Sequence, residues 1–151
     1  MSDSPNIVWF RNDLRLSDNP AMSAAAAEGG PVVPVYILDD ESPGEFAMGA
    51  ASRWWLHHSL RRLNEALDGR LIIVRGNAAK LIPTLVADTG AKRVYWNRGY
   101  EPWQIRRDRW IKKTLRDGGV TAESYGGTLL FEPQSVMKAD GTPYRVFTPF
   151  Y

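Results

Sequence analysis

The sequence predicts an α/β fold with a five-stranded parallel sheet of strand order 3-2-1-4-5 and helices on both of its faces. Short apolar runs alternate along the chain with longer amphipathic segments, which is typical of parallel strands joined by crossover helices. The apolar runs are continuous, as expected for strands that are buried on both faces. A chain of 151 residues is long enough for one such domain with a sizeable core.

Clear boundary signals mark the first strand and the first helix. The apolar run 7–10 predicts a buried strand, and a polar loop follows it. Asp18 or Asn19 can cap a helix that has Pro20 in its first turn, and the glycine pair 29–30 ends that helix.

A second strand and a long helix come next. Residues 32–38 are predicted to form the strand, and 39–49 a loop rich in proline, glycine and acidic residues. Residues 50–67 are predicted to form the helix. Its apolar residues recur near helical spacing, at Trp54, Leu56, Leu60, Leu63 and Leu67.

The remaining elements repeat this alternation. The run 71–74 predicts a third strand, and a turn at 76–77 leads into a helix that reaches about Asp88. Pro83 is expected to kink that helix or to mark its true first turn. A fourth strand, a helix and a fifth strand follow at 93–96, 101–117 and 120–125.

Five strands separated by four helices imply right-handed crossovers and a doubly wound, Rossmann-like sheet. Ligands bind such sheets outside the carboxyl ends of the strands, where the strand order reverses. In the order 3-2-1-4-5 this reversal lies between the first and fourth strands. The topology therefore predicts a ligand crevice at the loops 11–18 and 97–101.

Residues in these two loops suit a binding site. Arg11 ends a buried strand and needs a counter-charge, for which Asp13 is close enough. Glu101 stands at the start of a predicted helix, where a negative charge is favourable, so its structural interpretation is a helix cap. Together with Asn97 and the surrounding aromatic residues, Glu101 could also bind a planar ligand that forms hydrogen bonds. Neither loop has the glycine pattern of a dinucleotide or P-loop site, which argues against a simple NAD or ATP enzyme.

Composition excludes several other classes of site. With no cysteine, the chain has no disulfide, thiolate nucleophile or cysteine zinc site. His57 and His58 point about 100° apart on a helix, so we predict no metal site there. No catalytic residue is predicted anywhere in the chain.

The basic clusters at 61–62 and 106–113 are interpreted first as solvated helix faces, since a net charge of +2 does not by itself argue for nucleic-acid binding. With no signal sequence and no long apolar run, we expect a cytoplasmic protein without membrane contact.

Five segments resemble, in order, the DNA photolyase and cryptochrome family, and most of all its bacterial photolyases. The first is WFRNDLRLSDN at 9–19. The others are SRWWL at 52–56, YWNRGYEP at 95–102, LFEP at 130–133 and YRVFTPF at 144–150. Together they extend the resemblance over almost the whole chain.

The resemblance implies that the chain is the N-terminal light-harvesting domain of a deoxyribodipyrimidine photolyase. In that family a separate, all-helical C-terminal domain binds FAD and repairs UV-induced pyrimidine dimers in DNA by light-driven electron transfer from reduced FAD. The parent protein is expected to be a carbon–carbon lyase, and this chain alone to be an inactive monomer. Its expected partners are its own C-terminal FAD domain and, through the full-length protein, UV-damaged DNA.

By the same resemblance, the antenna chromophore contacts the end of the second strand, the start of the long helix and the segment after the fourth strand. The expected residues are Ile37, Leu38, Asp39, Arg53, Asn97, Glu101 and Arg107. Folate-binding members carry an Asn-Glu pair where this chain has Trp103 and Gln104. A deazaflavin or flavin is therefore expected in preference to methenyltetrahydrofolate. Trp54 and Trp55 are expected to pack or to line a domain interface.

Two other functions stay open: a cryptochrome blue-light signalling domain without repair activity, and a free-standing flavin- or nucleotide-binding module. We expect 1–130 to form the antenna domain and 131–151 to begin the interdomain linker, with the helical FAD domain absent from this chain. The aromatic ending at 148–151 favours a fragment of a longer protein.

Overall fold

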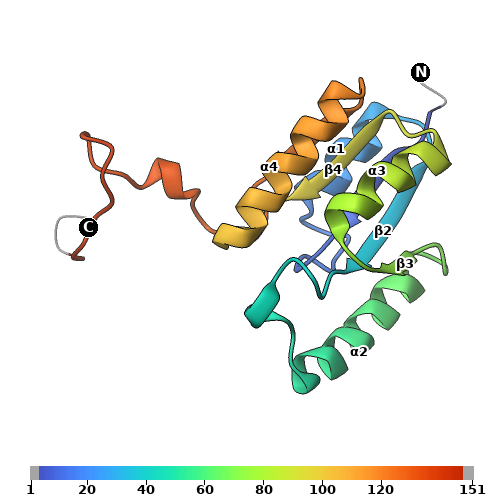
Figure 1. The fold of residues 1–151 in the computed structure, drawn as a ribbon, viewed down its shortest axis with the longest axis horizontal. Helices are drawn as coiled ribbons and strands as arrows, with labels where there is room; N and C mark the ends of the chain where they lie inside the picture. Colours follow the sequence, from blue (N-terminus) through green and yellow to red (C-terminus); the bar gives the residue numbers. More distant parts are fainter. Residues whose placement is uncertain (1–3, 148–151) are drawn as a thin grey trace.

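The computed structural model describes residues 4–147 and confirms the predicted α/β fold (Figure 1). Its strands and helices are β1 (Asn6–Phe10), α1 (Pro20–Glu28), β2 (Val32–Leu38), α2 (Ala50–Ala66), β3 (Ile72–Arg75), α3 (Ala78–Thr89), β4 (Arg93–Asn97), α4 (Pro102–Asp117) and β5 (Thr121–Tyr125). Neighbouring strands are parallel, and their order is β3-β2-β1-β4-β5, as predicted.

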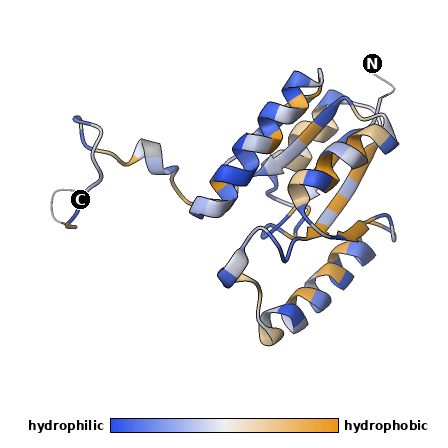
Figure 2. Cartoon of the chain, viewed as in Figure 1, coloured by the Kyte–Doolittle hydropathy of each residue, from blue (hydrophilic) through white to orange (hydrophobic). Residues whose placement is uncertain are grey.

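Alternate side chains of the central strands supply two cores, one on each face of the sheet. Ile7 and Trp9 of β1 belong to the core that α3 and α4 cover. Val8 and Phe10 belong to the core that α1 and α2 cover. Figure 2 shows hydrophobic residues in the strands and a mostly hydrophilic surface along α4.

Side-chain caps and glycines set the ends of the helices. The Asn19 side chain accepts a hydrogen bond from the Met22 amide at 3.1 Å, so Asn19 and not Asp18 caps α1, and Gly29 ends that helix. Asn77 caps α3 in the same way. Pro83 lies inside α3, five residues after its start, so the alternative that it marks the first turn is wrong.

Two details of α2 and β3 differ from the prediction. The Trp54 side chain does not join the buried stripe of α2, because it is 64% exposed whereas Leu60 and Leu63 are buried. Trp54 precedes Leu56 by two residues, which places it about 200° away around the helix. β3 begins one residue later than predicted, at Ile72, after a buried Leu71.

After β5 the chain leaves the sheet and extends away from it (Figure 1). This segment contains a short 3₁₀ helix (Pro133–Ser135) and an isolated bridge between Met137 and Pro143. The end of the last family-like segment, 148–150, lies outside the described residues. None of the helices in 4–147 is long and apolar enough to cross a membrane.

Candidate functional site

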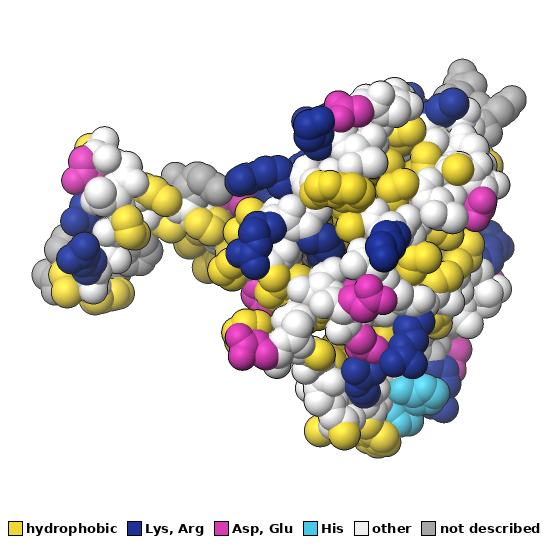
Figure 3. All heavy atoms as spheres, in the orientation of Figure 1, with side chains coloured by type: hydrophobic (Ala, Val, Ile, Leu, Met, Phe, Trp, Pro, Cys, Tyr) yellow, Lys and Arg dark blue, Asp and Glu magenta, His cyan; other side chains and the backbone are white. Residues whose placement is uncertain are grey.

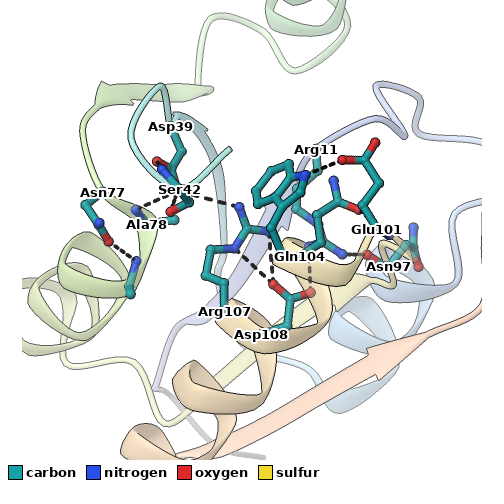
Figure 4. Close-up of polar contacts among 12 residues, drawn as sticks. Arg11, Asp39, Ser42, Asn77, Ala78, Asn97, Glu101, Gln104, Arg107 and Asp108 are labelled. Atoms are coloured by element: carbon teal, nitrogen blue, oxygen red, sulfur yellow. Dashed lines mark hydrogen bonds and ion pairs between the residues drawn. The ribbon is translucent and has the colours of Figure 1, made fainter. Parts of the chain in front are cut away.

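A pocket of about 390 Å³ opens at the carboxyl ends of β1 and β2. The loop 39–49 forms one of its walls and the start of α4 forms another (Figure 4). We call it the switch-point pocket, but it lies beside the predicted crevice and not within it. Of the loops 11–18 and 97–101, only Arg11, Asn12 and Glu101 line it, and the end of β2 with the loop 39–49 supplies most of the remaining lining. Its lining includes Trp9, Arg11, Tyr36, Ile37, Leu38, Asp39, Asp40, Phe46, Met48, Glu101, Trp103, Gln104 and Arg107.

Arg107 contacts two indole rings of this pocket. Its guanidinium carbon lies 4.8 Å from the ring centroid of Trp9 and 4.9 Å from that of Trp103. The Arg11 guanidinium lies 4.9 Å from the same Trp9 ring. Guanidinium groups against indole faces gain cation–π attraction, most of all where water is excluded. The arrangement fixes the Trp103 ring at the rim of the pocket.

The two arginines share one carboxylate, Asp108. Arg11 Nη1 lies 2.7 Å from Asp108 Oδ2, and Arg107 Nη2 lies 2.9 Å from Asp108 Oδ1. Arg11 also donates to the backbone carbonyl of Asn97. Burial lowers the pKa of Arg11, and the attraction of Asp108 opposes this shift.

The expectation that Asp13 pairs with the Arg11 side chain is therefore corrected. Asp13 accepts a hydrogen bond from the Arg11 backbone amide at 2.9 Å, and the side-chain ion pair goes to Asp108. Asp108 is 97 residues away in sequence, and the packing of α4 brings it to the end of β1.

Asp39 ties the wall of the pocket to α3. Its carboxylate accepts hydrogen bonds from the Ser42 amide at 2.9 Å and from the Ala78 amide at 3.1 Å, and it lies 3.6 Å from Arg107 Nη1. Burial by itself would raise the pKa of Asp39, but the hydrogen bonds from Ser42, Ala78 and Glu41 outweigh burial and lower it. Asp39 is thus held as an anion at the pocket wall.

Glu101 caps α4, which confirms its predicted structural role. Glu101 and Gln104 form a capping box, in which the Gln104 side chain accepts from the Glu101 amide at 3.4 Å. The Trp103 indole N–H donates to the Glu101 carboxylate. A Cβ on Gly99 would collide with the Gln104 side chain, so glycine at this turn leaves room for the cap.

Five of the seven predicted antenna residues line the switch-point pocket: Ile37, Leu38, Asp39, Glu101 and Arg107. Arg53 lies behind the wall, where it pairs with Asp40 at 2.7 Å and donates to the Met48 carbonyl at 2.8 Å. Asn97 is buried below the site and bonds to other protein groups.

Sequence reasoning missed Trp9 and Asp108 as parts of the site. Trp9 lies two residues before Arg11 in an extended segment, so the alternation of a strand could have placed the two side chains on one face. Asp108 lies four residues after Gln104, one turn further along the same side of α4. No group of His, Asp or Glu side chains suited to a metal occurs within 4–147.

Comparisons with known proteins connect this architecture to one family. A family model described as DNA photolyase matches residues 6–151. The deoxyribodipyrimidine photo-lyase of Agrobacterium fabrum is 47% identical over 154 residues, which cover 100% of this chain and 32% of that protein. Cryptochrome-2 of Arabidopsis thaliana is 40% identical over 153 residues, which cover 99% of this chain and 25% of that protein.

Solved structures agree with these matches. A bacterial class III photolyase from Agrobacterium tumefaciens superposes with a TM-score of 0.88 at 45% identity, covering 99% of this chain and 31% of that one. An archaeal photolyase from Sulfolobus tokodaii, solved with two FAD molecules, gives a TM-score of 0.78 at 30% identity, covering 97% of this chain and 33% of that one. The chain thus spans about a third of the length of these photolyases.

Proposed function

The chain belongs to the DNA photolyase family, and from this premise we propose that it is the N-terminal light-harvesting domain of a deoxyribodipyrimidine photo-lyase. In this proposal the lyase chemistry, FAD and contact with UV-damaged DNA belong to a longer parent protein. A bound antenna chromophore would supply light absorption and transfer of excitation energy to that FAD.

The observation that carries this proposal is the switch-point pocket. Its volume of about 390 Å³ lies within the usual range for small-molecule sites. Trp103 and Phe46 offer flat apolar surfaces, and Asp39 and Arg107 are fixed, ionised groups beside them. A planar heterocycle with polar edges matches such a lining, and each of these residues would bind or orient it.

Within this proposal we favour a deazaflavin or flavin over methenyltetrahydrofolate. Trp103 and Gln104 stand where folate-binding members have an Asn-Glu pair. The Trp103 indole N–H and the Gln104 side-chain oxygen are both bonded to Glu101 at the start of α4. The archaeal relative that was solved with two FAD molecules supports a flavin by analogy.

Chromophore titration tests the assignment. We expect the chain to bind FMN or a deazaflavin more tightly than methenyltetrahydrofolate, measured by equilibrium dialysis with absorbance detection. Trp103→Ala should raise the Kd about tenfold, because a stacking surface is lost. Trp110→Ala is the matched control, since Trp110 is also on α4 but does not line the pocket. Equal effects of the two variants, or tighter folate binding, would contradict the assignment.

A cryptochrome domain is the second candidate, favoured by the 40% identity to Arabidopsis cryptochrome-2. The two candidates share an antenna domain and differ in the activity of the longer protein. Splitting of pyrimidine dimers by the parent protein under blue light would decide for a photolyase. Binding of damaged DNA without splitting would favour a cryptochrome.

We further propose that the antenna domain extends to about residue 130 and that an interdomain linker follows. Gly127 and Glu132 are still bonded to side chains of the sheet domain, so the linker is proposed to begin close to these two residues. The Gly127 carbonyl accepts from Arg15 at 2.8 Å, and the Glu132 carboxylate accepts from Tyr100 at 2.7 Å. Limited proteolysis that cuts after 132 and leaves a stable core would support this boundary.

A further inference from the structure

A second hollow lies along α4, away from the switch-point pocket. Its volume is about 480 Å³, and five cationic side chains line it: Arg98, Arg109, Lys112, Lys113 and Arg116. We call it the basic groove. Figure 3 shows Lys and Arg side chains distributed along this helix. Arg107 of the same helix lines the switch-point pocket instead, so α4 separates the two sites.

Two carboxylates line the basic groove, Asp108 and Asp117, and each is already paired with a cation. Asp108 pairs with Arg11 and Arg107, and Asp117 pairs with Lys113 at 2.6 Å. In the part of the chain that the structure describes, Arg109, Lys112 and Arg116 form no ion pair with a carboxylate. Their positive charge is therefore free to attract an anion from solution.

The cations of the groove are held close together by the fold. The Lys112 ammonium donates to the Ser124 hydroxyl at 2.6 Å and lies 5.5 Å from the Trp96 ring centroid, while Arg98 donates to the Ser124 carbonyl at 2.7 Å. Burial lowers the pKa of Lys112, the like charges of Arg116 and Arg98 lower it further, and the carboxylates of Asp108 and Glu123 oppose this shift only in part. A bound anion would relieve this mutual repulsion.

The spacing of the cations suits a chain of phosphates better than a single one. Arg109 and Arg116 are seven residues apart, about 10 Å along the helix, and the exposed Arg106 extends the row by another turn. Beside this row lies Trp110, whose side chain is 51% exposed. Phosphate-binding cations with an exposed aromatic ring are the usual composition of a sequence-independent nucleic-acid surface.

We propose that the basic groove, with Trp110 beside it, binds the phosphodiester backbone of nucleic acid irrespective of sequence or damage. The contact is independent of the chromophore, because its residues lie on another side of α4. It also requires no lesion-binding domain, so the 151-residue chain alone should bind DNA.

Fluorescence anisotropy with a short, labelled, undamaged DNA duplex tests the proposal. The groove variant is Arg109→Gln combined with Arg116→Gln. The control is Lys80→Gln combined with Lys92→Gln, which removes the same charge from exposed positions outside the groove. We expect the groove variant to bind about tenfold more weakly and to lower the slope of log K against log salt by about 2. The control should stay within about twofold of the parent chain.

Three results would overturn the proposal: no binding at low salt, equal losses in the groove variant and the control, or displacement of the DNA by inorganic phosphate as readily as by unlabelled duplex at matched phosphate concentration. The last result would mean a site for small anions. Circular dichroism verifies folding of each variant. If the first variant does not fold, Arg106→Gln with Arg109→Gln replaces it, since both of these side chains are exposed and form no ion pair within 4–147.

Discussion

Asn97 joins three segments through one buried amide group. Its Nδ2 donates to Asp13 Oδ2 at 2.6 Å and to Asn19 Oδ1 at 2.8 Å, and its Oδ1 accepts from the Ala21 amide at 3.1 Å. These bonds connect the end of β4 to the first loop and to the start of α1. Asn97 thereby fixes the backbone from which Arg11 enters the site.

Asn97→Ala is expected to lower the free energy of unfolding by about 3 kcal/mol, because it removes one donor each from the buried Asp13 and Asn19 oxygens and the acceptor of the Ala21 amide. Urea denaturation measures the change. Asn12→Ala is the control, an exposed asparagine in the first loop, and it should cost less than about 0.5 kcal/mol. Similar costs for the two variants would show that the amide network contributes little.

Tyr36 makes the fold sensitive to alkali. Burial, and after it the Asp40 carboxylate, raises the pKa of Tyr36 from 10.0 to about 12. The unfolded chain therefore loses this proton first as the pH rises. The stability that neutral Tyr36 contributes is complete below pH 10.0 and is lost as the pH rises to about 12.

Tyr36→Phe should reduce the decline in unfolding free energy between pH 10.0 and about 12. Urea denaturation at a series of pH values measures this slope. An unchanged slope in the variant would assign the alkaline sensitivity to other groups.

The residues of the pocket could be predicted only in part. Ile37, Leu38, Asp39, Glu101 and Arg107 line it, as the family resemblance implies. The role of Trp9 could not be predicted, because an apolar run such as 7–10 is equally typical of a strand that only forms core. The role of Asp108 could not be predicted either, because its neighbours in the sequence are the basic residues of α4. Their roles depend on contacts between distant segments, such as that of Arg11 with Asp108, which local patterns do not reveal.

Among the elements, the loop 39–49 depends on Arg53 for its shape. Arg53 joins Asp40 at one end of the loop to the Met48 carbonyl at the other. Arg75 also pairs with Asp40, at 3.1 Å, but its side chain is more exposed. Arg53 therefore acts on the pocket by positioning its wall.

Arg53→Ala should weaken chromophore binding several-fold while the free energy of unfolding changes by less than about 1 kcal/mol. Arg75→Ala is the control, because it removes a partner of Asp40 and leaves the bond to Met48 intact. Dialysis and urea denaturation give the two readouts. A large loss of stability with unchanged affinity would make Arg53 a structural residue only.

Element positions could be predicted well because caps and glycines are local signals. Asn19 and Asn77 cap the starts of α1 and α3, and Gly29 follows the end of α1, at the helix boundaries that the sequence predicts. The one-residue shift of β3 has a different origin: Leu71 is buried but lies outside the ladder, and apolar character reports burial and not hydrogen bonding. Trp54 was misplaced because hydrophobicity alone cannot tell a core position from an exposed face.

At the scale of the whole molecule, this chain and its proposed parent should differ in activity. The chain spans about a third of the length of its photolyase relatives. We expect it to split no pyrimidine dimers in light, even when FAD is added. Chromatographic analysis of a dimer-containing oligonucleotide after illumination checks this. Repair by the chain alone would refute the division of roles proposed above.

The pairing of Arg11 with groups far along the chain has a consequence for the order of folding during synthesis. Its side-chain partners lie 86 and 97 residues downstream, and β1 also needs β4 as its second neighbour in the sheet. Ribosomes add about 5–20 residues per second, so β1 waits several seconds for these partners. Until α4 has left the ribosome, Trp9 lacks part of the helical layer that covers its face of the sheet, whereas Phe10 faces α1 and α2, which emerge earlier. The two faces of the sheet are therefore expected to be covered one after the other.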